Sequence, residues 1–178
     1  CSNLTDITIP SCVASIGASA FVCCKSLTSI TIPYGVTALS ERLFSSCEHL
    51  TDVVIPSSVS SIGSDAFYSC KSLTSITIPR SVTSIGSDAF SFCRKLNDIT
   101  IPDRVAYIGS SAFRGCESLT SITIPYGITS IGIYTFENCS SLVSVTLPNS
   151  VTEIMERAFY GCENLTSISI PSSVTRLG

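Results

Sequence analysis

Residues 70–92 read CKSLTSITIPRSVTSIGSDAFSF, and the same pattern returns every 23 residues along the 178-residue chain. Cysteine opens each unit, at positions 1, 24, 47, 70, 93, 116, 139 and 162. Proline recurs with the same period from Pro10 to Pro171, and phenylalanine recurs from Phe21 to Phe159. Internal repetition with a short fixed period is typical of a solenoid. We number the units coil one (residues 1–23) to coil eight (residues 162–178).

Each part of the unit has a physical interpretation. Residues 75–78 alternate between a hydroxyl residue and isoleucine, and a period of two predicts a short strand with one buried side. Pro79 offers no N–H to a strand ladder, so the strand ends there. A second extended segment is expected over residues 82–85, and Gly86 then turns the chain. We expect about one helical turn to begin at residues 89–90.

A unit of this size is one coil of a parallel solenoid, in which equivalent residues stack about 4.8 Å apart. The expected fold is a β-rich α/β solenoid, a right-handed leucine-rich-repeat superhelix of short parallel strands with one helical turn per coil. Residues 1–178 are expected to form a single domain of about 7.7 coils, and the bare ends suggest a piece of a longer repeat protein. The positions expected to point inward are Leu73, Ile76, Ile78, Val82, Ile85, Ala89, Phe90, Cys93 and their equivalents.

Coils two and seven depart from the common pattern. Residues 39–42 and 154–157 lose the usual glycine and gain Glu and Arg. We expect a longer helical turn in these two coils.

Composition excludes two classes of partner. Charged residues make up 13% of the chain, and the net charge is −3. Ten scattered Lys and Arg residues supply neither a basic nucleic-acid footprint nor a polybasic membrane patch. Mean hydropathy is +0.46, yet no apolar run approaches the roughly 18 residues that cross a bilayer. We expect no nucleic-acid binding and no membrane insertion by this segment.

The cysteines are expected to be free thiols in the core. A straight row of parallel Cβ vectors does not converge on a disulfide partner or on a tetrahedral metal site. A disulfide between neighbouring coils stays an alternative, because their Cα atoms lie within the range of such a bridge. Cys12 and Cys23 stand outside the periodic column and are expected to be exposed.

Catalytic patterns are missing from the sequence. No Gly-x-Ser-x-Gly elbow occurs, and the single histidine, His49, lies in a variable column. The periodic glycines are turn residues and do not form a phosphate loop. We expect no enzyme activity, no catalytic residue, no metal and no cofactor.

The pattern Cys-x-x-Leu-x-x-Ile-x-Ile-Pro-x-x-Val-x-x-Ile-Gly-x-x-Ala-Phe resembles the BspA-type (Treponema-type) leucine-rich repeat over the whole chain. The resemblance implies adhesion or protein recognition at the cell surface or in a secreted protein, and it implies no chemistry. The column that holds asparagine in commoner leucine-rich repeats holds Cys12, Gly35, Ser58, Ser81, Arg104, Gly127, Ser150 and Ser173. Proline and a serine-rich corner are therefore expected to shape that turn.

The outward face of the first strand carries the candidate partner-binding residues. One of its two columns holds Asp or Ser, and the other holds mostly Thr. In curved repeat proteins this sheet lines the concave side, where partners bind, so a shallow hydroxyl-rich groove for a protein or glycan is expected. The residues assigned to it are Asp6, Thr8, Ser29, Thr31, Asp52, Val54, Ser75, Thr77, Asp98, Thr100, Ser121 and Thr123. The alternative is that Thr favours strands and Ser favours solubility.

Two functions stay open at this stage. The first is a cell-surface adhesion module that recognises a host or extracellular-matrix protein through the concave strand face. The second is a structural spacer in a longer surface rod, with no ligand of its own. The near-identity of the coils favours the spacer, whereas the alternating Asp column and the resemblance favour binding. Ice binding is disfavoured, because the Asp or Ser column breaks a strict Thr-x-Thr pair. The sequence indicates no particular ligand and no oligomeric state.

Overall fold

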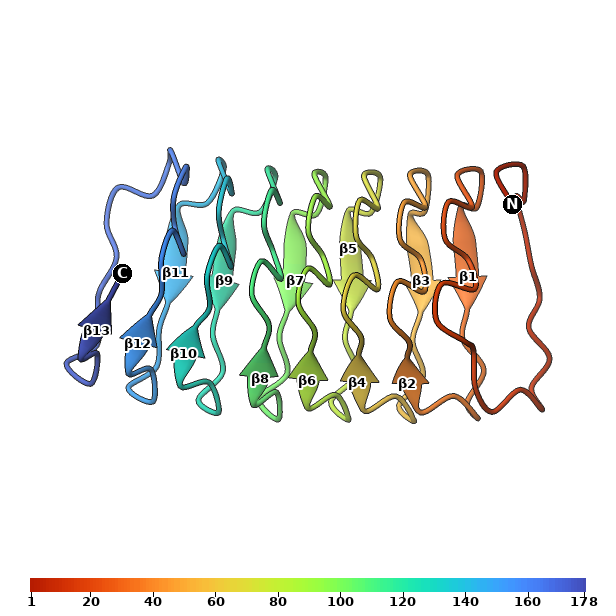
Figure 1. Ribbon diagram of the computed structural model, residues 1–178, viewed down its shortest axis with the longest axis horizontal. Helices are drawn as coiled ribbons and strands as arrows, with labels where there is room; N and C mark the ends of the chain where they lie inside the picture. The colour runs from red at the N-terminus through yellow and green to blue at the C-terminus, as the bar shows by residue number, and fades with distance from the viewer.

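The computed structural model describes residues 1–178 as a β-solenoid whose coils lie side by side in one row, with the two termini at opposite ends (Figure 1). The first strand of successive coils is β1 (Ser29–Thr31), β3 (Asp52–Val54), β5 (Ser75–Thr77), β7 (Asp98–Thr100), β9 (Ser121–Thr123) and β11 (Ser144–Thr146). The second strand is β2 (Ala38–Leu39), β4 (Ser61–Ile62), β6 (Ser84–Ile85), β8 (Tyr107–Ile108), β10 (Ser130–Ile131), β12 (Glu153–Ile154) and β13 (Arg176–Leu177).

All strand pairs are parallel, and each residue pairs with the residue 23 positions further along, as the repeat predicted. The first strands form three pairs, β1–β3, β5–β7 and β9–β11. The second strands form two sheets, β2-β4-β6-β8 and β10-β12-β13. Coil one contributes no strand, although its residues 6–8 carry the same sequence pattern. The chain contains no helix with the length and hydropathy that a membrane span requires.

The helical turn predicted in each coil is wrong, and so is the α/β class that depended on it. In coil four, Asp88 and Phe92 have positive φ angles of 53° and 58°, which interrupt a right-handed helix. The amides of residues 88, 90 and 92 donate to carbonyls of coil five. These amides are therefore bonded to the next coil instead of to a helix. We call residues 87–93 and their equivalents the turn segment.

Coils two and seven have the same turn segment as the others. Arg42 and Arg157 have positive φ angles of 56° and 53°, at the position that Asp88 occupies in coil four. The longer helical turn expected in these coils is therefore also wrong. Ser40 and Met155 stand at the position of Gly86, and the Glu and Arg that follow them leave the positive φ angle of the turn segment in place.

The core lies between the strands and the turn segments, and the inward positions predicted for coil four are all buried. Its most regular feature is a stack of phenylalanine rings that runs from coil one to coil seven. The rings of Phe67 and Phe90 have centroids 5.3 Å apart and planes inclined by 4°. Complete burial of a phenylalanine side chain stabilises a fold by about 1.5–3 kcal/mol. The stack therefore joins successive coils through apolar contact.

The periodic cysteines are free thiols, as predicted, and those of the central coils are fully buried, whereas Cys1, also expected in the core, is exposed because no coil precedes it in the structure. The Cys93 thiol donates a hydrogen bond to the Phe67 carbonyl oxygen 3.1 Å away, and the same bond recurs from Cys47 to Cys162. Burial raises the pKa of Cys93 to about 12, because an apolar surrounding disfavours the thiolate. Cys12 and Cys23 are exposed, also as predicted.

A serine hydroxyl shapes the corner that follows four of the eight prolines, in line with the serine-rich corner expected from the missing asparagine column. Ser58 donates to the Val36 carbonyl oxygen at 2.7 Å. Equivalent bonds link Ser81, Ser150 and Ser173 to the preceding coil. We call the two positions after each proline the proline corner. It lies along the lower edge of Figure 1, between the ends of the first strands and the starts of the second.

Candidate functional site

The outward side of the first strands is an exposed surface of hydroxyl and carboxylate groups, which we call the strand face. All twelve side chains assigned to it from the sequence are exposed. In each first strand the central residue is buried and its two neighbours face solvent, as in β5. Because the strands pair in register, Ser75 lies beside Asp98 and Thr77 beside Thr100. The face therefore presents two straight columns of side chains, which are polar except for Val54.

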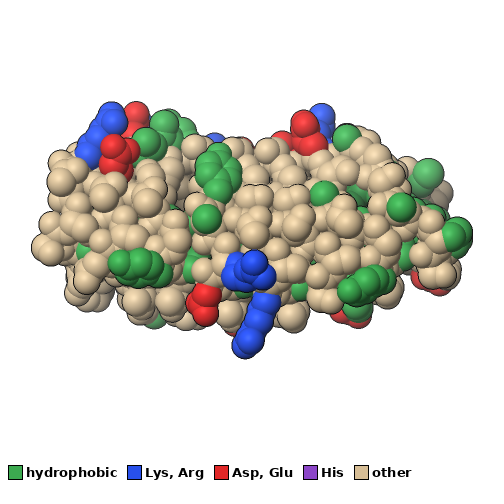
Figure 2. All heavy atoms as spheres, turned by 90° about the horizontal axis from the view of Figure 1, so that it is seen from below, with side chains coloured by type: hydrophobic (Ala, Val, Ile, Leu, Met, Phe, Trp, Pro, Cys, Tyr) green, Lys and Arg blue, Asp and Glu red, His purple; other side chains and the backbone are tan.

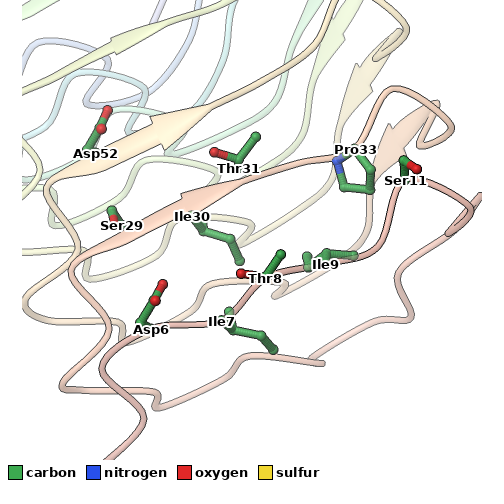
Figure 3. Close-up of a pocket in the computed structure, with 10 residues that line it drawn as sticks. All are labelled: Asp6, Ile7, Thr8, Ile9, Ser11, Ser29, Ile30, Thr31, Pro33 and Asp52. Carbon is green, nitrogen blue, oxygen red and sulfur yellow. The ribbon is translucent and has the colours of Figure 1, made fainter.

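The N-terminal part of the strand face contains a hollow of about 410 Å³. Figure 3 shows Asp6, Ser29 and Asp52 in a line along one side of it, each from a successive coil. The isoleucines of the same segments, Ile7 and Ile30, point to the opposite side of the chain. Asp6 and Asp52 are two coils apart, roughly 10 Å at the spacing of strands. That separation is too long for two carboxylates that bind one ion.

A larger hollow of about 760 Å³ lies over coils four and five, and we call it the central groove. Its walls include the strand-face residues of β5 and β7, among them Asp98 and Thr100. The groove is also lined by Arg80, Asp103 and Arg104 of the proline corner. The sequence analysis did not assign these three residues to a binding site. The available signal was Arg104 itself, since it stands in a column where four other coils have serine.

The ion pairs of the molecule lie away from the strand face. All five involve residues of the turn segment or the residue that follows the periodic cysteine. The Arg94 Nε–Glu117 Oε1 distance, for example, is 3.3 Å. No ion pair involves the strand face or the proline corner, so the charged groups there remain free to contact a partner.

The exposed groups of the strand face are suited to hydrogen bonding with another molecule. Its hydroxyls donate and accept hydrogen bonds, and its carboxylates accept them. The one imidazole, that of His49, lines neither hollow, and its Nδ1 lies 2.7 Å from the Lys25 carbonyl oxygen. No group of three or more His, Cys, Asp or Glu side chains is arranged to hold a metal ion.

Short parallel strands stacked coil on coil, with one open face, define a solenoid repeat protein. The sequence matches the BspA type Leucine rich repeat region in six copies, over residues 1–120 and 60–178, and the chain belongs to that family. Repeat proteins of this family are generally involved in protein interaction or associated with the cell surface, and are typically scaffolds without enzyme activity.

Three solved structures show the same fold. A leucine-rich repeat protein from T. pallidum is 35% identical with a TM-score of 0.80, over 86% of this chain and 72% of that one. One from Bacteroides ovatus is 37% identical with a TM-score of 0.90, over 93% of this chain and 43% of that one. A leucine-rich cell surface protein from Faecalibacterium prausnitzii is 33% identical with a TM-score of 0.53, over 98% of this chain and 62% of that one. This chain therefore spans less than half of the Bacteroides protein. A comparison with curated proteins found no match.

Proposed function

We propose that this chain is a cell-surface protein-binding module that recognises a host or extracellular-matrix protein through the strand face. The observation that carries the proposal is the contrast in ion pairing. All five ion pairs lie in the turn segments or beside the periodic cysteines, and no charge of the strand face takes part in one. The Faecalibacterium protein is described as a cell surface protein, which supports a surface location for its relatives.

The spacing of the strand face suits a protein partner. Neighbouring coils place equivalent side chains about 4.8 Å apart, and the two outward residues of one strand are separated by about 7 Å. An extended segment of a partner offers polar groups at comparable intervals. The carboxylates of Asp6, Asp52 and Asp98, one in every second coil, attract basic groups and raise the association rate.

The alternative is a structural spacer without a ligand of its own. The hydrogen bonds between coils favour the spacer. Those of the thiols and serines recur from coil to coil and make a regular rod. A spacer needs no particular side chain on the strand face beyond a soluble one. Charge reversal on the strand face therefore distinguishes the two functions. It is expected to abolish the binding of a module and to leave a spacer unaffected.

The experiment measures binding of the purified chain to immobilised fibronectin and fibrinogen by biolayer interferometry. The test variant is Asp6→Lys/Asp52→Lys/Asp98→Lys. The control is Glu41→Lys/Glu153→Lys/Glu163→Lys, which makes the same charge change at unpaired acidic residues outside the strand face. Saturable binding that only the test variant loses supports the module. Binding by neither matrix protein, or equal binding by both variants, contradicts it and favours the spacer.

A further inference from the structure

The central groove has a rigid floor. It lies over β5 and β7, which pair in register as one of the three two-stranded units of the first row. Its volume of about 760 Å³ falls in the range of clefts that bind ligands. The isoleucines on the inner side of both strands are buried in the core, so packing against the core fixes the position of the strands.

The charges of the groove are separated along the strand direction. Asp98 is the first residue of β7, whereas Arg80 and Arg104 follow the prolines at the other end of the two strands. Asp103 is five positions after Asp98, and extended chain spans roughly 17 Å over five positions. One end of the groove is therefore acidic, and the other carries two guanidinium groups beside one carboxylate. Figure 2 shows basic side chains next to an acidic one near the middle of the molecule, with further charged side chains along the edges of this view.

Arg104 lacks the hydrogen bond to the preceding coil that serine makes at the equivalent position of other coils. In four other coils this column holds a serine that donates to the preceding coil, as Ser81 does to the Val59 carbonyl oxygen. Arg104 is exposed and makes no such hydrogen bond. Arg80 likewise forms no ion pair with Asp103, although the two stand in equivalent positions of adjacent coils. The charged side chains in the proline corner of coils four and five therefore form no ion pair within the chain and are available to a partner.

The rest of the proline corner carries no charge. The equivalent positions of the other coils hold Ser, Tyr, Gly, Asn or Cys. Tyr126, in the coil next to Asp103, is 75% exposed. Tyr34 stands in the same column, 72% exposed, in a coil remote from the groove. The groove thus has an exposed aromatic ring beside it, and aromatic and Arg side chains are the usual anchors of protein interfaces.

We infer that the central groove binds an extended peptide segment of a partner protein, one that carries a basic and an acidic side chain about five residues apart. This inference rests on the proposed function and names the part of the face that selects the partner. The basic side chain lies against Asp98, and the acidic side chain lies between Arg80 and Arg104. Charge complementarity fixes the direction of the peptide, because the reversed direction places like charges together.

The exposed hydroxyls between the two charged ends complete the site. Ser75, Thr77 and Thr100 line the groove and face solvent. Each donates and accepts a hydrogen bond, as peptide amides and carbonyls require. Such contacts tolerate many sequences, so the charges at the two ends supply the specificity.

The test selects a phage-displayed library of random 12-residue peptides on the immobilised chain. The expected result is enrichment of peptides in which a basic and an acidic residue recur in one order at a constant spacing. Selection on Arg80→Glu/Arg104→Glu is expected to replace the acidic residue by a basic one. The control Lys95→Glu/Arg176→Glu makes the same charge change at exposed, unpaired residues outside the groove, and its peptides are expected to match those of the wild type. Peptides without a charge pattern, or a pattern unchanged by the groove variant, overturn the inference.

A second measurement uses the enriched peptide, labelled with fluorescein, in fluorescence polarisation. Tyr126→Ser is expected to weaken its affinity several-fold, whereas Tyr34→Ser, the same exchange in the same column, is expected to leave it unchanged. If the two exchanges weaken the affinity equally, the peptide does not bind in the central groove as inferred. The failures are distinguishable: if matrix binding depends on the strand-face aspartates but not on Arg80 and Arg104, the proposed function stands and the groove inference fails.

Discussion

The two long sides of the solenoid differ in what their side chains are bonded to. On the turn-segment side, phenylalanine rings stack, thiols donate to carbonyls and charges pair between coils. On the strand face the side chains of both columns are exposed, and none of their charges is paired. Substitutions on the first side are therefore expected to change stability, and substitutions on the second to change binding. Four predictions test this division.

The largest loss of stability is expected for Phe90→Ala. Phe90 is fully buried and stacks on Phe67 and Phe113. Removal of its ring leaves a cavity between three coils, and such exchanges cost about 3–5 kcal/mol. Urea unfolding followed by circular dichroism measures the difference. Thr100→Ala on the strand face is the contrast, with an expected change below about 0.5 kcal/mol. Comparable losses in the two variants contradict the division.

The next effect concerns the ion pair between Arg114 and Glu137. Its Nε–Oε2 distance is 2.5 Å, and the Glu137 side chain is only 5% exposed. Arg114→Ala leaves that carboxylate buried without its counter-charge, which is expected to cost about 1–3 kcal/mol. The double variant Arg114→Ala/Glu137→Gln is expected to recover part of the loss, because a neutral amide is cheaper to bury. Arg80→Ala in the central groove is the control and is expected to leave the unfolding midpoint unchanged.

Alkaline pH is expected to destabilise the fold through the buried thiols. The pKa of Cys93 is raised to about 12 in the folded chain from an ordinary value of 9.0. Between these values the unfolded chain releases the proton and the folded chain retains it, so the free energy of unfolding falls as pH rises. One thiol contributes about 1 kcal/mol between pH 9 and pH 10.

The measurement is urea unfolding at pH 7, 9 and 10. Cys93→Ala is expected to reduce the fall between pH 9 and pH 10 by that amount, whatever its own effect on stability at pH 7. Cys23→Ala, at an exposed thiol, is the control for the loss of one cysteine. An identical pH profile for the wild type and Cys93→Ala argues against this account of the buried thiols.

The smallest effect is expected in the serine ladder of the proline corner. Ser81→Ala removes the hydrogen bond from its hydroxyl to the Val59 carbonyl oxygen, at a cost of about 1 kcal/mol. Ser57 is exposed and makes no side-chain hydrogen bond, so Ser57→Ala is expected to change stability by less than about 0.5 kcal/mol. Differential scanning calorimetry of both variants checks the pair. A loss at Ser57 equal to that at Ser81 shows that the ladder has no particular role.

The repeat period predicted the solenoid, the parallel register and the inward columns. Those features depend on spacing: residues 75–78 alternate, Pro79 stops the strand, and identical units stack at identical positions. The resemblance to the BspA-type repeat came from the same columns. The strand face also followed from alternation, since the neighbours of a buried strand residue point outward.

The tertiary structure alone decided the turn segment and the central groove. Ala89 and Phe90 suit a helical turn locally, yet the amides of residues 88, 90 and 92 bond to the next coil. The thiol bonds join residues 26 positions apart, such as Phe67 and Cys93. Arg80, Asp103 and Arg104 line one hollow because two coils stack. Each of these features depends on contacts between coils, and a pattern within one coil specifies only what each residue does in its own strand or turn.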